Sequence, residues 1–149
     1  MTVLTEKAVL DAPVERVWEV LSATHRYAEW VAVVREVTDH HGEATVGRTY
    51  SERNVLLGPL TTRTTWTVLE VVPMSRRVDA GVGFPLVQDL RSAFLLRPVP
   101  EGTELTYEVT YGFPFGRIGG VLDKAQQGGQ RHAMRQSLTN LAELLRSEA

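Results

Sequence analysis

The chain has 149 residues, the length of one ordinary domain, and we expect a single domain over residues 1–149. It has no cysteine, which excludes disulfides and zinc–cysteine sites, and its formal net charge of -2 gives no field that would attract nucleic acid. No apolar run approaches the roughly 18 residues of a membrane span, and the first residues lack a secretory pattern. We therefore expect a cytoplasmic protein with no cofactor, metal or nucleic-acid partner. Arginine supplies nearly all the positive charge, which is typical of a high-GC bacterial genome.

The N-terminal part of the chain predicts one strand and two short helices. Thr2–Leu10 alternates in character and is rich in β-branched residues, which favours a strand. Pro13 suits the first position of a helix, and apolar residues at helical spacing follow it up to Leu21. A second short helix is expected over His25–Trp30, because Ser22-Ala23-Thr24 before it offers a capping side chain.

The middle of the chain predicts six strands separated by turn residues. The extended segments are Val33–His40, Arg48–Leu57, Leu60–Val72, Arg76–Phe84, Leu86–Pro98 and Thr103–Phe113. Consecutive strands with such short connections pair antiparallel as a meander. The last segment alternates most clearly, which predicts one buried and one solvated face. Its expected buried residues are Leu105, Tyr107, Val109, Tyr111 and Phe113.

Beyond Gly116 the apolar residues recur every three or four positions, which predicts one long C-terminal helix. Gly128 and Gly129 interrupt this pattern, and each costs roughly 1 kcal/mol relative to alanine within a helix. We therefore expect a kink or a close backbone approach at the two glycines. The whole order is a strand, two short helices, six strands and a long helix, an α+β arrangement.

This order and three local sequences resemble the SRPBCC superfamily, which includes START domains and the birch-pollen allergen fold. The sequences are Ala12–Leu21, Tyr27–Trp30 and Gly102–Thr106. Within the superfamily the chain is most similar to the bacterial polyketide cyclase/dehydrase-like group. The resemblance implies a helix-grip fold, in which a curved antiparallel sheet of about seven strands wraps around the C-terminal helix. It also implies a cavity between the two, with an opening near the second short helix.

A bent sheet around one helix leaves space that a chain of this size cannot fill, and apolar clefts of this kind are common ligand sites. We therefore expect a small hydrophobic, lipid-like, aromatic or polyketide-like molecule in the cavity. Any single aromatic residue at an inward position is more often plain core, but as a set these residues describe a wall. The expected ligand-binding residues are Trp30, Tyr50, Trp66, Phe84, Phe94, Tyr107, Val109, Tyr111, Phe113, Leu122 and Ala125.

Candidates for catalysis are few. Tyr107 and Tyr111 carry hydroxyl groups that could orient a bound ring, and His132 is the histidine on the predicted long helix. The helical position of His132 favours the protein surface over the cavity. His40 and His41 are expected in a turn, with no third ligand at a spacing that suits a metal.

Charged residues on the predicted strands are expected mostly on the solvated face. They are Glu52, Arg53, Glu70, Asp79, Asp89 and Arg91. A carboxylate that instead points inward, between an arginine and apolar walls, would have a shifted pKa and would be a better catalytic candidate than the residues above. A bulge within Leu60–Val72 would reverse the facing of every later residue, so the sequence leaves this choice open.

Three functions fit these patterns. The first is a binding protein for a small hydrophobic molecule, which needs only the cavity. The second is an enzyme of the polyketide cyclase/dehydrase type, which requires an acid or base inside the cavity. The third is a regulatory or protein-interaction domain, which would have a closed interior and an exposed apolar patch. A monomer and a homodimer both fit.

Overall fold

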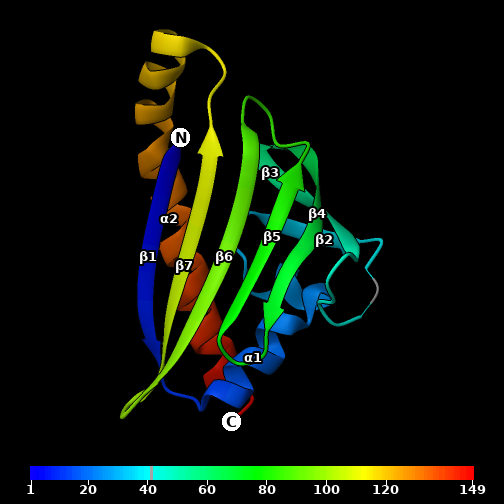
Figure 1. Ribbon diagram of the computed structural model, residues 1–149, viewed down its shortest axis with the longest axis vertical. Coiled ribbons are helices and arrows are strands. Elements are labelled where there is room, and N and C mark those ends of the chain that lie inside the picture. The colour runs from blue at the N-terminus through cyan, green and yellow to red at the C-terminus, as the bar shows by residue number, and fades with distance from the viewer. Residues whose placement is uncertain (41) are drawn as a thin grey trace.

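One curved antiparallel sheet wraps around a long helix in the computed structural model, which describes residues 1–40 and 42–149 (Figure 1). In chain order the elements are β1 (Thr2–Leu10), α1 (Val14–Ser22), the 3₁₀ helix η1 (Thr24–Glu29), β2 (Val34–Thr38), β3 (Thr49–Leu57), β4 (Leu60–Val72), β5 (Arg76–Val82), β6 (Gln88–Val99), β7 (Gly102–Gly112) and α2 (Gly116–Ser147). This is the predicted α+β helix-grip fold.

The sheet has the strand order β1-β7-β6-β5-β4-β3-β2. Six strands therefore form a simple meander, and the first strand closes beside the last one, with Thr2 opposite Tyr111 and Leu10 opposite Thr103. Register shifts bend the sheet at several places, among them between Val68 and Glu70 on β4 and between Gln88 and Arg91 on β6. Such irregularities increase local twist and curvature, so the sheet closes around one side of the helix.

The two short helices differ in detail from their prediction. Pro13 is the N-cap of α1 and not its first helical residue, and its carbonyl accepts from the amide of Val17 at 3.1 Å. The second helix, η1, is a 3₁₀ helix without a side-chain cap. Its N-cap is Ala23, from the segment expected to supply a capping side chain, and the hydroxyl of Thr24 in that segment donates to the carbonyl of Gly42 at 3.1 Å.

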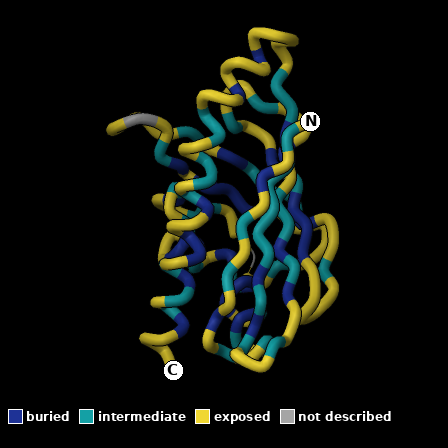
Figure 2. The backbone as a smooth tube through the Cα atoms, turned by 90° about the vertical axis from the view of Figure 1, so that its left-hand side faces the viewer, coloured by how far each residue is buried: buried dark blue, intermediate teal, exposed yellow. Residues whose placement is uncertain are grey.

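The core lies between the sheet, α1 and the C-terminal half of α2, where Leu138, Leu141 and Leu145 are buried. The first turns of α2 extend past the sheet and are mostly exposed (Figures 1 and 2). The helix runs without interruption from Gly116 to Ser147, and a Cβ atom added at Gly128 or Gly129 would meet nothing within 4 Å. The close approach predicted at these glycines is therefore wrong, because this part of the helix packs against no other backbone.

Candidate functional site

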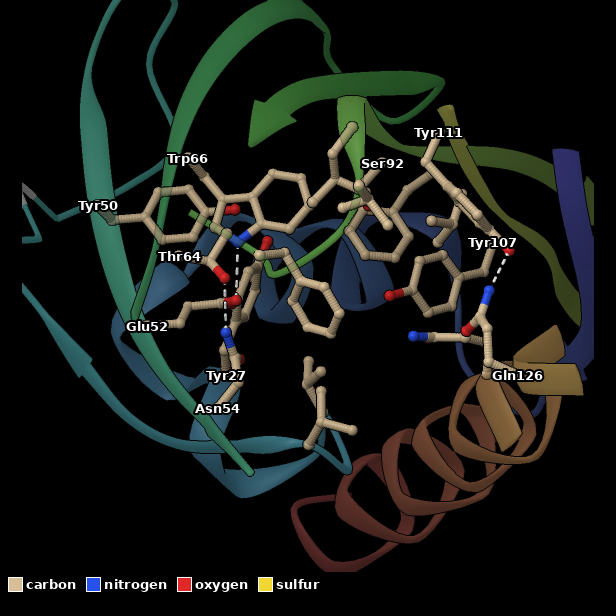
Figure 3. Close-up of a pocket in the computed structure, with 18 residues that line it drawn as sticks. Tyr27, Tyr50, Glu52, Asn54, Thr64, Trp66, Ser92, Tyr107, Tyr111 and Gln126 are labelled. Carbon is tan, nitrogen blue, oxygen red and sulfur yellow. Dashed lines mark hydrogen bonds between the residues drawn. The ribbon is translucent and has the colours of Figure 1, made fainter. Parts of the chain in front are cut away.

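A cavity lies between the inner face of the sheet, η1 and the middle of α2 (Figure 3). Its volume is about 90 Å³ for the centre of a water-sized sphere, which is several times the space that one water molecule needs. The lining residues are Tyr27, Val31, Val33, Tyr50, Glu52, Asn54, Thr64, Trp66, Phe84, Val87, Leu90, Ser92, Phe94, Tyr107, Val109, Tyr111, Gln126 and Gln130.

Seven of the eighteen lining residues are aromatic, and several of their rings pack against one another. The rings of Phe94 and Tyr107 are 4.9 Å apart and tilted, and those of Tyr27 and Tyr50 meet edge to face at 5.6 Å. Aromatic pairs in these arrangements are worth about 0.5–1.5 kcal/mol beyond their buried area. The wall is therefore a rigid surface that suits a flat apolar ligand.

The inner end of the cavity carries a polar group of four residues on β3 and β4, which we call the polar end: Glu52, Asn54, Thr64 and Trp66. Alternate residues of each strand point inward, and the register places Glu52 opposite Thr64. The indole nitrogen of Trp66 donates to Oε1 of Glu52 at 2.7 Å, and Nδ2 of Asn54 donates to Oγ1 of Thr64 at 2.8 Å (Figure 3). Two diagonal cross-strand bonds thus hold these four side chains in place.

Glu52 is only 6% exposed, and burial raises the pKa of its carboxyl group to about 7. The negative charge of Asp79 raises this pKa further, while the hydrogen bond from Trp66 and the charge of Arg77 oppose the rise. Near neutral pH, Glu52 therefore exists both as a carboxylic acid and as a carboxylate. A side chain of this kind can donate or accept a proton inside the cavity.

A buried ion pair lies behind the polar end. Arg77, only 1% exposed, donates from Nε to Oδ1 of Asp79 at 3.0 Å and from Nη1 to the carbonyl of Leu21 at 2.5 Å. The hydroxyl of Tyr50 donates to Oδ2 of Asp79 at 2.5 Å. The charge of Arg77 is therefore balanced within the protein, and the guanidinium is not free to hold an anionic ligand.

At the opposite end of the cavity, a hydrogen-bond network joins β1 and β7 to α2. Tyr111 donates to Oδ1 of Asp123 at 2.5 Å, and Nε2 of Gln126 donates to the hydroxyl of Tyr111 at 2.5 Å (Figure 3). Thr2 and Gln127 donate to the other oxygen of the same carboxylate. Burial opposes ionisation of Asp123, but these hydrogen bonds outweigh it and lower its pKa to about 2.

Most of the residues expected to bind a ligand line this cavity. They are Tyr50, Trp66, Phe84, Phe94, Tyr107, Val109 and Tyr111. The hydroxyl of Tyr107 points into the cavity between its two ends (Figure 3).

Four expected residues do not line the cavity. Trp30 is 0% exposed and belongs to the core, and Phe113 packs edge to face on Tyr111 at 6.0 Å. Leu122 is 45% exposed and Ala125 is also exposed, because α2 turns Asp123 and Gln126 toward the sheet in their place. The apolar face of α2 lies farther along the helix, where it packs on the core, and this face does not extend to the cavity.

The three histidines within the described residues lie outside the cavity. His132 is exposed on α2, as its helical position favoured. His40 is exposed, with its ring centre 5.5 Å from that of His25, whereas His41 lies outside the described residues. In the part of the chain that the structure describes, no three histidine, aspartate or glutamate side chains gather as they would around a metal ion.

Sequence reasoning placed strand charges mainly in solvent, and the structure divides them. Arg53, Glu70, Asp89 and Arg91 are exposed as expected. Glu52 and Asp79 point inward, which is the case that the sequence left open. The inward facing of Glu52 was indicated by its position two residues after Tyr50 on the same strand, since alternate residues share a face.

The polar lining was also missing from the sequence prediction. Asn54, Thr64, Ser92 and Gln126 are polar residues on the inward face, and apolar patterning does not mark such positions. Tyr27 replaces the expected Trp30, because the 3₁₀ geometry of η1 turns Tyr27 toward Tyr50.

The curved sheet, the long helix and the amphipathic cavity between them define a protein of the helix-grip class, and comparison with known proteins gives the family. The family model described as "Polyketide cyclase / dehydrase and lipid transport" matches residues 1–146. The chain therefore belongs to this family. No curated protein matches the chain.

Solved structures share this fold at low sequence identity. A protein from Thermus thermophilus has a TM-score of 0.82 at 18% identity over 99% of each chain. One from Chromobacterium violaceum has a TM-score of 0.75 at 22% identity over 97% of each chain. A protein in the dynemicin biosynthetic locus has a TM-score of 0.70 at 19% identity over 98% of this chain and 48% of its own.

Across residues 1–40 and 42–149, no helix has both the length and the apolar character needed to cross a bilayer.

Proposed function

We propose that the protein binds a small, mainly apolar molecule in the cavity between the sheet and α2. The observation that carries this proposal is the composition of the wall, in which aromatic rings in mutual contact surround a few fixed polar groups. Ligand sites in proteins have this composition, because apolar area supplies affinity and a small number of polar groups fix orientation. The family assignment to cyclases, dehydrases and lipid transport supports the same proposal.

The test uses mass spectrometry to identify small molecules extracted from the purified protein. It compares wild type with two variants that each introduce a tryptophan. Val109→Trp fills the cavity, whereas Val9→Trp adds the same bulk at an exposed position of β1. We expect wild type and Val9→Trp to release the same small molecule and Val109→Trp to release none. Equal recovery from both variants, with both folded by circular dichroism, would overturn the proposal.

Cyclase- or dehydrase-type catalysis is the second candidate, and the position of Glu52 favours it. A carboxylate with a pKa of about 7 inside the cavity can remove a proton from the carbon next to a carbonyl group. The substrate then becomes an enolate, and the carboxylic acid that forms returns a proton to it.

Proton exchange tests the enzymatic candidate directly. We expect wild-type protein to exchange the α-protons of 2-tetralone for deuterium in D₂O, measured by NMR, and Glu52→Gln to lose this rate enhancement. His132→Ala, at an exposed position outside the cavity, is the control and should exchange at the wild-type rate. Equal exchange with wild type and Glu52→Gln would leave ligand binding as the function.

The interaction-domain alternative predicted a closed interior. The structure has an open cavity with ordered polar groups instead. Small-molecule binding therefore accounts for more of the molecule than this alternative does.

A further inference from the structure

We propose that the polar end of the cavity recognises an uncharged hydroxyl group on the ligand, of the phenol or enol type. This inference rests on the proposed function, and it assigns the chemistry of the ligand at one end of the cavity. It depends on two side chains of β3, Asn54 and Glu52, and on the charges of the described residues around them.

Asn54 has a buried hydrogen-bond acceptor without a donor. Its side chain is 2% exposed, and its Nδ2 group is occupied by Thr64. Its Oδ1 atom is buried and has no hydrogen-bond partner among the described residues. An unsatisfied buried acceptor is costly, so a ligand that brings a donor within reach of this atom would relieve that cost.

Glu52 supplies the complementary contact. Its Oε1 atom accepts from Trp66, and within the described residues no hydrogen bond engages its second oxygen. As a carboxylic acid, Glu52 can donate from this second oxygen to an oxygen atom of the ligand. Glu52 and Asn54 are two residues apart on one face of a strand, a backbone separation of roughly 7 Å. A hydroxyl oxygen between them can accept from Glu52 and donate to Asn54.

The charges around the polar end select against an anionic ligand. Glu52 faces Asp79 and Arg77 from β5, and Arg77 is bound by Asp79. The other ionisable groups that face it are Tyr27 from η1, Tyr50 from β3 and Tyr107 from β7.

Burial raises the pKa of all three tyrosines, so they stay neutral. Among the residues that the structure describes, a ligand carboxylate would therefore meet no unpaired cation at this end, and it would repel Glu52 whenever that side chain is ionised. A hydroxyl group avoids this repulsion and still offers the donor that Asn54 lacks.

The experiment compares three bicyclic probes by equilibrium dialysis against the intact protein at pH 6, where Glu52 is mainly protonated. The probes are 2-naphthol, its methyl ether 2-methoxynaphthalene, and 2-naphthoate. We expect 2-naphthol to bind about tenfold more tightly than the ether, the ratio that one buried hydrogen bond gives. We expect 2-naphthoate to bind more weakly than 2-naphthol.

Two matched variants locate the effect. Asn54→Leu removes the acceptor at nearly constant size and should bring the ratio of the naphthol and ether affinities close to one. Asn140→Leu makes the same change on α2, outside the cavity, and should leave the ratio as in wild type. Thermal unfolding of both variants checks that each is folded.

The outcomes separate the two proposals. Equal binding of 2-naphthol and its ether to wild type, or preferred binding of 2-naphthoate, would overturn the hydroxyl proposal and leave ligand binding intact. No binding of any probe would overturn both. The comparison in wild type decides the matter even if Asn54→Leu fails to fold.

Discussion

At the scale of single residues, the sequence Tyr50-x-Glu52-x-Asn54 sets the character of the cavity. The three side chains share the inner face of β3, so an aromatic ring, a carboxyl group and an amide line the cavity in one row (Figure 3). Aromatic residues at inward positions could be predicted, because burial favours them. Only the alternation from Tyr50 indicated that Glu52 faces inward, and the general tendency of charged strand residues to be solvated favoured the opposite.

The raised pKa of Glu52 predicts a pH-dependent stability. The folded protein holds this proton up to a pH of about 7, compared with 4.5 for an ordinary carboxyl group. The folded state therefore binds more protons between these values, and stability falls as pH rises through this window, by about 3 kcal/mol at most. Glu52→Gln does not titrate, so its stability relative to wild type should increase between pH 4.5 and 8.

Urea unfolding of wild type and Glu52→Gln at pH 4.5 and pH 8 measures this difference. Glu143→Gln, at an exposed position of α2, is the control and should follow wild type at both values. Parallel stability curves for wild type and Glu52→Gln would contradict the raised pKa.

Because Arg77 and Asp79 form a buried ion pair, we expect that removing one partner lowers the free energy of unfolding more than replacing both partners does. Asp79→Ala leaves a buried guanidinium without its partner and should cost about 3–5 kcal/mol in the free energy of unfolding. The double variant Arg77→Met with Asp79→Leu should cost less, because it leaves no unpaired charge.

Chemical denaturation measures these losses. The exposed ion pair of Arg53 and Glu36, 3.2 Å apart, serves as the control for the buried pair. Glu36→Ala should cost at most about 1 kcal/mol. Similar losses for Glu36→Ala and Asp79→Ala would show that the buried pair contributes no more than a surface one.

At the scale of elements, the two halves of α2 are held in place by different interactions. Its C-terminal half packs into the core through Leu138 and Leu141, while its N-terminal half is anchored mainly at Asp123. The apolar repeat predicted this helix because its packed half has the expected spacing. The anchoring could not be predicted, since it depends on Tyr111 and Thr2 from strands far away in the sequence.

The anchor at Asp123 predicts a local effect on dynamics. In Asp123→Leu, the hydrogen bonds from Thr2, Tyr111 and Gln127 are lost, so residues 116–130 should exchange their amide hydrogens faster. Residues 134–145 should exchange as in wild type, because core packing holds them. Hydrogen–deuterium exchange with mass spectrometry resolves the two halves, and uniform acceleration along α2 would refute a local anchor.

The strands show the same limit of prediction. The register shift between Val68 and Glu70 falls inside the Leu60–Val72 segment. A bulge in this segment makes it impossible to predict from alternation alone which later residues face inward. Beyond that shift the inward positions on β4 change parity. The alternation of β7 has no such break from Leu105 to Tyr111, and its inner face could be predicted throughout.

At the scale of the whole molecule, the order of the elements and the resemblance to the SRPBCC superfamily together predicted the helix-grip fold. The sheet order agrees with that prediction. The cavity itself could be anticipated only as a space between sheet and helix. Its polar end depends on side chains whose facing follows from the detailed register.

Occupancy of the cavity predicts stabilisation of the entire domain. At a free 2-naphthol concentration of a hundred times its Kd, the free energy of unfolding should rise by about 2.7 kcal/mol, because the unfolded chain has no cavity. Chemical denaturation with and without 2-naphthol measures this rise. Val109→Trp should show no such rise, and an equal rise in that variant would place the binding elsewhere.

The hydrogen bond from Trp66 to Glu52 has an optical consequence. An indole excited by ultraviolet light responds to the charge and solvent next to its ring, and Trp66 has a titrating carboxyl group on one side and the ligand space on the other. Neither Trp18 nor Trp30 lines that space. The intrinsic emission of the protein should therefore register, without any added dye, both the proton on Glu52 and the arrival of a guest molecule.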